Sequence, residues 1–205
     1  MSLHAVAVTS GYVGSGLGVA MVVPQIVRTL RHRTLPGVSA LSWALTAVSC
    51  IGWLLYGVRT GELPQIPGNV LLVSGAVAIV LLVPSASTVG ARAAGLAGCA
   101  VGLGLLAAIA PAPLLGAGAF AIGMVSGFPQ IRRSIARRAT AQSAVSLLTW
   151  WLRVASQACW FGYAFAIGDV TVMVSAAFLL SSALLVVGTE LARRRPAPAC
   201  AVALA

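Results

Sequence analysis

Val22-Val23-Pro24-Gln25-Ile26-Val27-Arg28 is the stretch that decides the fold of this chain, and it recurs in altered form as Gly127-Phe128-Pro129-Gln130-Ile131-Arg132-Arg133. In each copy a Pro-Gln pair interrupts an apolar run, and arginine follows within about a turn. A proline inside a helix removes one backbone hydrogen bond and clashes with the carbonyl group of the preceding turn. Such a break is costly in lipid unless it faces protein or a wet cavity. Two breaks at matching places therefore predict two half-molecules that meet around a site.

The composition predicts an integral membrane protein. Of the 205 residues, 60% are hydrophobic and only 8% are charged, whereas a soluble domain has about 25% charged residues. The net charge of +10 comes from 13 basic side chains, all arginine, against three acids. These arginines lie between apolar runs, so we interpret them as topology signals and not as a surface that binds nucleic acid. The four cysteines have no paired spacing, so we expect no metal site, no cofactor and no disulfide framework.

Seven apolar runs are long enough to cross a bilayer, which takes roughly 20 residues. They cover residues 11–30, 39–59, 66–84, 91–110, 114–133, 145–166 and 170–188. Most arginines fall at run ends that share one side of a seven-span arrangement, and the positive-inside rule makes that side cytoplasmic. We therefore expect the N-terminus outside, the C-terminus in the cytoplasm, and a disordered basic tail over residues 189–205.

The apolar runs also form an internal repeat. Residues 37–43 match residues 144–150, and each segment ends in tryptophan. The same offset aligns further polar and aromatic pairs: Ser49 with Ser156, Trp53 with Trp160, and Tyr56 with Tyr163. Each repeat spans three helices, over residues 11–84 and 114–188, and the run at 91–110 is left over as a linker. One extra span restores the direction of the second copy, so we predict an all-α membrane fold with two parallel three-helix repeats in a 3+1+3 layout.

Glycine pairs with G-x-x-x-G spacing occur at Gly14 and Gly18 in the first run and at Gly98 and Gly102 in the linker. Small residues on one helix face allow close contact between helices in lipid. Glycine is also abundant throughout the chain, with 22 residues. A packing role and simple abundance therefore both stay open for these pairs.

The duplicated Pro-Gln stretch, with three helices per repeat and a linker between, resembles the PQ-loop superfamily. Within it, the layout resembles the SWEET sugar transporters and their half-size relatives, the SemiSWEETs, over about residues 11–188. The resemblance implies that a Trp on the second helix and an Asn on the third line a sugar site, and Trp53 and Asn69 match that pair. Trp160 matches in the second half, but the Asn position falls at Ala176, with Ser175 beside it. The two halves are therefore expected to differ at the site.

The resemblance also implies an outer gate made of tyrosine and an arginine–acid pair. The residues that match this set are Tyr56, Arg59 (displaced by one position), Glu62, Tyr163 and Asp169. Our hypothesis is that Arg59 pairs with Asp169 when the outer side closes. The alternative is that these are solvated loop charges, which contribute little to stability.

The residue types suit a sugar site on chemical grounds. An indole face can stack on the apolar face of a sugar ring, and an amide offers both donors and an acceptor. Ser49 lies one turn before Trp53, and Ser156 lies one turn before Trp160, so each pair shares a helix face. The alternatives are ordinary packing or an interfacial belt for the tryptophans, and a helix–helix hydrogen bond for Asn69.

The Pro-Gln pairs then become candidate hinges of an inner gate. Pro24 and Pro129 would bend their helices near the cytoplasmic side, and Gln25 and Gln130 would satisfy the carbonyl groups that the prolines free. A static kink is the alternative. Arg153, just inside the sixth run, is expected to extend its side chain to the cytoplasmic interface.

No Asp, Glu or His falls in the middle of a predicted span, which disfavours a proton-coupled carrier. No pattern of a nucleophile with a base is visible, so we expect no enzyme. We therefore predict facilitated transport of a small neutral polar solute, first of all a sugar, by alternating access. The alternatives are transport of amino acids or another metabolite, and a PQ-loop receptor that does not transport.

The expected partners follow from this prediction. They are the solute and the lipid bilayer, with no nucleic acid, and assembly into a homo-oligomer stays open. The N-terminus lacks the basic start of a signal peptide, so the first apolar run is expected to be retained as a span. The absence of lysine favours a bacterial protein of the plasma membrane.

Overall fold

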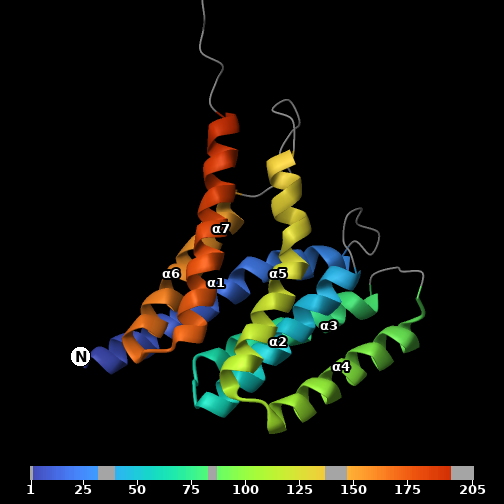
Figure 1. Cartoon of the computed structure of the whole chain (residues 1–205). Helices are drawn as coiled ribbons and strands as arrows, with labels where there is room; N and C mark the ends of the chain where they lie inside the picture. The colour runs from blue at the N-terminus through green and yellow to red at the C-terminus, as the bar shows by residue number, and fades with distance from the viewer. Residues whose placement is uncertain (1, 32–39, 83–86, 137–146, 195–205) are drawn as a thin grey trace, which may run out of the picture.

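The computed structural model describes residues 2–31, 40–82, 87–136 and 147–194, and the regular structure in these ranges is helical. Seven helices follow one another there: α1 (Leu3–Arg31), α2 (Ala40–Thr60), α3 (Gln65–Leu82), α4 (Val89–Ile109), α5 (Ala112–Ala136), α6 (Leu147–Ile167) and α7 (Val170–Arg194) (Figure 1). Each helix overlaps one of the seven predicted spans, so the all-helical fold with seven helices is confirmed.

The surface of these helices is apolar. Within the described ranges, five helices, α1, α2, α3, α4 and α7, are long and apolar enough to cross a membrane. Large side chains such as Leu105, Leu148 and Phe165 are 66%, 70% and 71% exposed. Apolar surface this wide is not found on soluble monomers. The chain is therefore an integral, multi-pass membrane protein.

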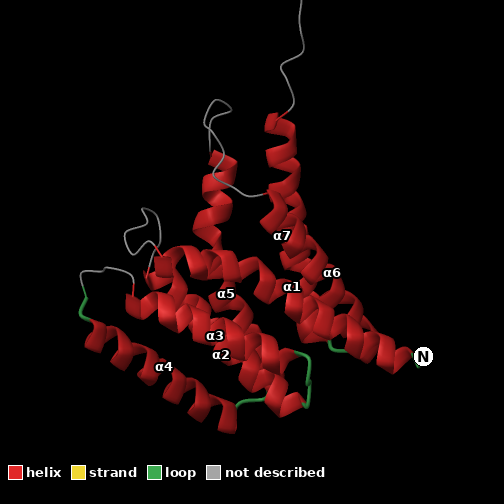
Figure 2. Ribbon diagram, turned by 180° about the vertical axis from the view of Figure 1, so that it is seen from behind, coloured by secondary structure: helices red, strands yellow, loops and turns green. Residues whose placement is uncertain are grey.

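The helices form two groups that meet through two contacts. Helix α1 packs against α6, and α2 packs against α5. Within the groups, α3 lies against α1 and α2, and α7 lies against α5 and α6 (Figure 1, Figure 2). Helix α4 lies along one flank of the bundle (Figure 1, Figure 2). Only 6% of its most apolar segment is buried inside the protein. The α1–α6 and α2–α5 contacts therefore hold the bundle together.

The two contacts use equivalent residues of the aligned repeats. The Ser49 hydroxyl on α2 donates to the Ala119 carbonyl oxygen on α5 at 2.7 Å. The Ser156 hydroxyl on α6 donates to the Gly14 carbonyl oxygen on α1, also at 2.7 Å. Both serines are buried, and a buried hydroxyl needs such a partner. Ser49 and Ser156 therefore link helices across the bundle.

Small residues let the same helices approach closely. A Cβ atom on Gly52 would lie 2.8 Å from the Cβ atom of Ala119, and one on Gly14 would lie 3.2 Å from the Cβ atom of Cys159. Gly14 thus makes the close helix contact that its G-x-x-x-G pair suggested. On α4, Cβ atoms at Gly98 and Gly102 would meet no described atom within 4 Å, so that pair shows no packing role within the described chain.

Helix α7 is longer than predicted. Residues 189–194, assigned above to a disordered tail, form its last turns. They include the good helix formers Glu, Leu, Ala and Arg, and arginines at a helix C-terminus complement its dipole. As a consequence Glu190, expected in the tail, lies within the helix and is 1% exposed.

The two Pro-Gln pairs do not end their helices. Helix α1 runs through Pro24 to Arg31, and α5 runs through Pro129 to Ala136. The side chains of Pro24, Gln25, Pro129 and Gln130 lie outside the described residues. Their roles as hinges or as static kinks therefore stay predictions.

Gly52→Ala is expected to destabilise the protein. The added Cβ atom would meet the Cβ atom of Ala119, which is fixed to its backbone and cannot rotate away. Overpacking of this kind typically costs about 1–3 kcal/mol. Gly98→Ala on the open face of α4 is the matched control, and it should keep or raise stability because alanine is the better helix former.

Thermal unfolding of the purified variants in detergent measures the difference. The melting temperature should fall for Gly52→Ala only. A Gly52→Ala variant that melts at the wild-type temperature would contradict the close packing of α2 on α5.

Candidate functional site

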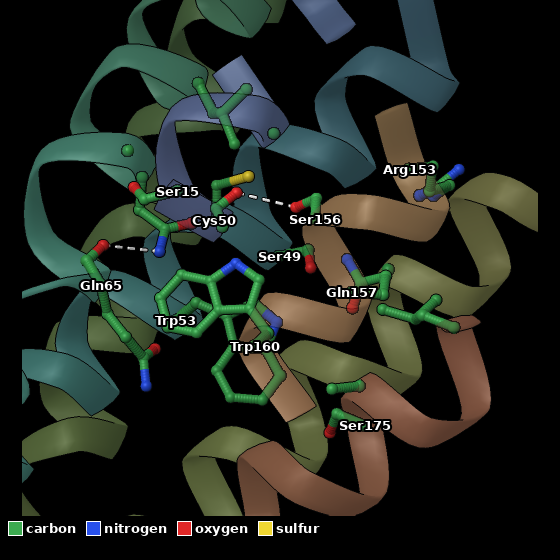
Figure 3. A pocket seen from close by; sticks show the side chains of 18 of the residues that line it. Ser15, Ser49, Cys50, Trp53, Gln65, Arg153, Ser156, Gln157, Trp160 and Ser175 are labelled. Atoms are coloured by element: carbon green, nitrogen blue, oxygen red, sulfur yellow. Dashed lines mark hydrogen bonds between the residues drawn. The ribbon is translucent and has the colours of Figure 1, made fainter. Parts of the chain in front are cut away.

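A cavity of about 250 Å³ lies between the helices. Residues from α1, α2, α3, α5, α6 and α7 line it, and none of the described residues of α4 does. The lining includes all the residues that were predicted to bind substrate: Ser49, Trp53, Asn69, Ser156, Trp160 and Ser175. Figure 3 labels five of them, all but Asn69. The fold thus gathers these residues of both repeats around one space.

Two indole rings form part of the cavity wall. Trp53 packs edge-on against Tyr56, with ring centroids 5.6 Å apart and an interplanar angle of 80°. Trp160 packs in the same way against Tyr163, at 5.6 Å and 77°. Both tryptophans also pack against one buried cluster that contains Tyr56. The tyrosines therefore orient the indoles at equivalent places in the two repeats, and each tryptophan stays partly exposed.

Asn69 keeps hydrogen-bonding capacity for a ligand. Its amide nitrogen donates to the Gln65 carbonyl oxygen, one turn earlier, at 2.8 Å. A side-chain amide has a second N–H and an acceptor oxygen, and both remain for the cavity. The amide nitrogen of Gln65 is buried with no hydrogen-bond partner in the described part of the chain. Gln65 lines the cavity too, although the comparison of the repeats did not single it out.

The three serines that were predicted to bind substrate already have partners for their hydroxyl protons. Ser49 and Ser156 donate to neighbouring helices, and Ser175 donates to the Thr171 carbonyl oxygen in its own helix at 2.8 Å. A hydroxyl that donates in this way offers a ligand only its oxygen lone pairs. If these serines contact the substrate as expected, they can only accept hydrogen bonds from it.

Arg153 and Gln157 also line the cavity. From the sequence, Gln157 was not singled out, and Arg153 was assigned to the membrane interface, with a carboxylate-binding role only in the receptor alternative. They share a face of α6 with Trp160, because the three lie at helical spacing. This spacing could have identified Arg153 and Gln157 as residues of the site, because Trp160 was already expected to face it. Arg153 was expected to reach the membrane interface, but its Nε atom is buried.

Tyr56 and Asp169 join the two groups of helices at the end where α2 turns into α3. The Tyr56 hydroxyl donates to the Asp169 carboxylate, with distances of 2.9 and 2.8 Å to its two oxygens. Asp169 also accepts from the N–H of Val172 at 3.0 Å, as an N-cap residue does. Hydrogen bonds to a charged acceptor are stronger than neutral ones. This one links α2 to the start of α7.

The predicted pair of Arg59 and Asp169 is not formed in this structure. The Arg59 guanidinium donates to the carbonyl oxygens of Ala107 and Ala110, the second at 3.1 Å. These groups end α4, where unpaired carbonyls and the negative end of the helix dipole attract a cation. The comparison of repeats could not find this partner, because the linker helix has no counterpart in either repeat.

Glycine–acid pairs end α2 and α6 in the same way. Gly61 and Gly168 have φ angles of 74° and 76°, a left-handed conformation that glycine adopts readily. The N–H groups of Glu62 and Asp169 then donate to carbonyl oxygens of the preceding helix turn at 2.8 and 2.9 Å. This is the Schellman pattern of helix termination. Helix termination therefore brings both acids to one end of the bundle.

The remaining members of the predicted outer gate differ in their surroundings. Tyr163 is 1% exposed, and its ring lies against the backbone at Gly11. Burial raises the pKa of the Glu62 carboxyl above its ordinary value of 4.5, and the negative charge of Asp169 raises it further, while His4 opposes both. Glu62 and Asp169 are therefore close enough for their charges to repel each other.

Comparison with known proteins supports the fold. No protein-family model matches the chain, and no curated protein matches its sequence. A solved structure of a eukaryotic SWEET transporter matches it with a TM-score of 0.78, over 93% of this chain and 98% of that chain, at 16% sequence identity. A match at this identity establishes a shared fold. The chain therefore has a SWEET-like fold, as the resemblance of its repeats implied.

Glu62→Gln tests the raised pKa of Glu62, whose causes are burial first and the negative charge of Asp169 second. Because folding raises the pKa of Glu62, the folded state binds a proton there more tightly than the unfolded chain does. Wild-type stability should therefore gain from this group as the pH falls toward 4.5, and lose that gain as the pH rises through the raised pKa. Glu62→Gln removes the titration and should be the more stable protein at neutral pH.

Melting temperatures of both proteins in detergent, from roughly pH 5 to pH 8, measure this difference. The gap between variant and wild type should close as the pH falls. A gap that stays constant over the whole range would show that Glu62 does not titrate as inferred.

Proposed function

We propose that this protein is a facilitative membrane transporter of a small polar solute, with a sugar as the first candidate. The observation that carries the proposal is the cavity between the two helix groups, with one oriented indole from each. The flat faces of Trp53 and Trp160 suit the apolar face of a sugar ring, and the free groups of Asn69 suit its hydroxyls. A volume of about 250 Å³ is slightly below the roughly 300–1,000 Å³ of most ligand pockets. It favours a small solute.

We propose further that α1–α3 and α5–α7 are two parallel repeats and that α4 is the linker between them. The matched hydrogen bonds of Ser49 and Ser156 support this layout, because each donates from the second helix of one repeat to the first helix of the other. The low burial of α4 also supports it. The arginine distribution supports an outside N-terminus and a cytoplasmic C-terminus.

Alternating access then consists of the two repeats rocking about the cavity. The hydrogen bond from Tyr56 to Asp169 would hold the outer end closed, and outward opening would break it. Pro24 and Pro129, with Gln25 and Gln130, stay the proposed hinges at the inner end. In this arrangement Arg59 stays on the end of α4, and Tyr56 takes the place at Asp169 that the outer-gate hypothesis gave to Arg59.

Two observations support facilitated diffusion. Among the described residues that line the cavity there is no Asp, Glu or His, so none of these groups would carry a proton together with the solute. The solved structure that shares the fold is also that of a transporter. Uptake should therefore follow the solute gradient alone.

Trp53→Ala is expected to lower uptake by roughly 5–30-fold, because a lost aromatic contact of about 1–2 kcal/mol corresponds to that factor. Trp151→Ala is the matched control, because Trp151 is 48% exposed on α6 and is not part of the cavity lining. Purified protein in liposomes would be tested with a panel of radiolabelled sugars and amino acids, with and without a pH gradient.

Sugar uptake that needs no pH gradient and depends on Trp53 is the expected result. Uptake of amino acids but not of sugars would indicate the alternative function, a transporter of amino acids. Folded protein that takes up no solute of the panel would contradict transport and favour a receptor.

A further inference from the structure

Arg153 is the one charged side chain among the described residues that line the cavity. The other lining residues contribute hydroxyl, amide, thiol, backbone and apolar groups. No carboxylate of the described lining balances the guanidinium. The cavity therefore presents a single positive charge to whatever enters it.

Packing, and not an acid, holds the guanidinium of Arg153. Its Cζ atom lies 5.5 Å from the ring centroid of Trp150, which is itself buried against Val186 and Val187 of α7. The Nε atom of Arg153 is buried and has no hydrogen-bond partner within the described residues. A buried N–H donor without a hydrogen-bond partner is unfavourable. An anionic group that entered the cavity would relieve this cost.

The charge belongs to one half of the molecule only. At the offset that aligns the two tryptophans, the equivalent of Arg153 is Thr46, and the equivalent of Gln157 is Cys50. All four residues line the cavity. Arg153 and Gln157 lie one turn apart on the same face of α6. The second repeat thus offers a guanidinium and an amide where the first offers a hydroxyl and a thiol.

Guanidinium and amide groups together suit a carboxylate. The planar guanidinium can bind both carboxylate oxygens through two parallel N–H···O bonds, and the amide of Gln157 adds a further donor. A neutral solute could accept hydrogen bonds from the guanidinium but would leave its charge unbalanced, and a cationic solute would be repelled. The charge and its neighbours therefore select for a solute with one negative group.

We propose that the solute is a sugar acid, whose ring lies at the indoles of Trp53 and Trp160 and whose carboxylate is bound by Arg153 and Gln157. This inference rests on the proposed transport function. It replaces the neutral solute that was predicted from the sequence. That prediction placed Arg153 at the membrane interface, so no charge was expected in the cavity.

Glucuronate and glucose are the probes, because they share a pyranose ring and differ by one carboxylate. Wild-type protein in liposomes should prefer glucuronate by about tenfold or more, the factor expected of a charge-assisted pair. Arg153→Thr installs the residue of the first repeat and should lose this preference, so that the ratio of glucuronate uptake to glucose uptake falls toward one. Arg153→Lys keeps the charge without the planar fork and should retain part of the preference.

Arg92→Gln is the control, since Arg92 lies on α4 and donates to the Val80 carbonyl oxygen, away from the cavity lining. It should keep the wild-type preference. If Arg153→Thr does not fold, inhibition of wild-type glucose uptake decides, and unlabelled glucuronate should inhibit at a concentration about tenfold lower than unlabelled glucose.

The outcomes separate the inference from the proposed function. Glucose uptake without a preference for glucuronate, or a preference that Arg153→Thr leaves unchanged, would overturn the sugar acid and leave sugar transport standing. Uptake of amino acids but of neither sugar would also overturn it. No uptake of any solute by folded wild-type protein would remove the transport function itself.

Discussion

Close contact between helices of the two groups is the constraint on which this structure depends. In lipid, apolar side chains gain little by meeting one another, so helices associate through small residues and hydrogen bonds. Gly14 and Gly52 let the backbones of α1 and α6, and of α2 and α5, approach each other. Ser156 and Ser49 then bond across the same contacts. Because these helices also carry the indoles of the cavity, a change in the contact would move the site.

The two halves agree at the helix contacts and at the indoles, and they differ at other positions that line the cavity. Each serine of the helix contacts has an equivalent with the same partner type, but Asn69 is matched by Ala176 and Thr46 by Arg153. A packing residue is constrained by a neighbour that must change with it. A cavity residue leaves one side open to the solute, so one half can acquire a charge while the helix contacts stay matched.

The sequence predicted the parts of the site that depend on repetition and helical spacing. Trp53 and Trp160 were found because they occupy equivalent positions, and both line the cavity. The partners that Arg59 has in this structure could not be predicted, because they are backbone carbonyl groups of α4, outside the aligned segments. Every residue has a backbone carbonyl group, so the sequence does not indicate which of these groups will accept a hydrogen bond from an arginine. Glu190 was placed in a tail because the apolar run ends before the helix does.

Composition by itself determined that the chain is a membrane protein with seven helices in its described part, since apolar length is a local property of the chain. The repeat spacing predicted two similar halves. Only the tertiary structure decided which polar side chains form hydrogen bonds within the protein and which remain available to a ligand. It bonded the hydroxyls of Ser49 and Ser156 to neighbouring backbones, and it brought Arg153 to the cavity without an acid beside it. Those outcomes depend on which helices approach each other. The spacing of residues along one helix can be read from the sequence, but the distance between two helices depends on how they pack.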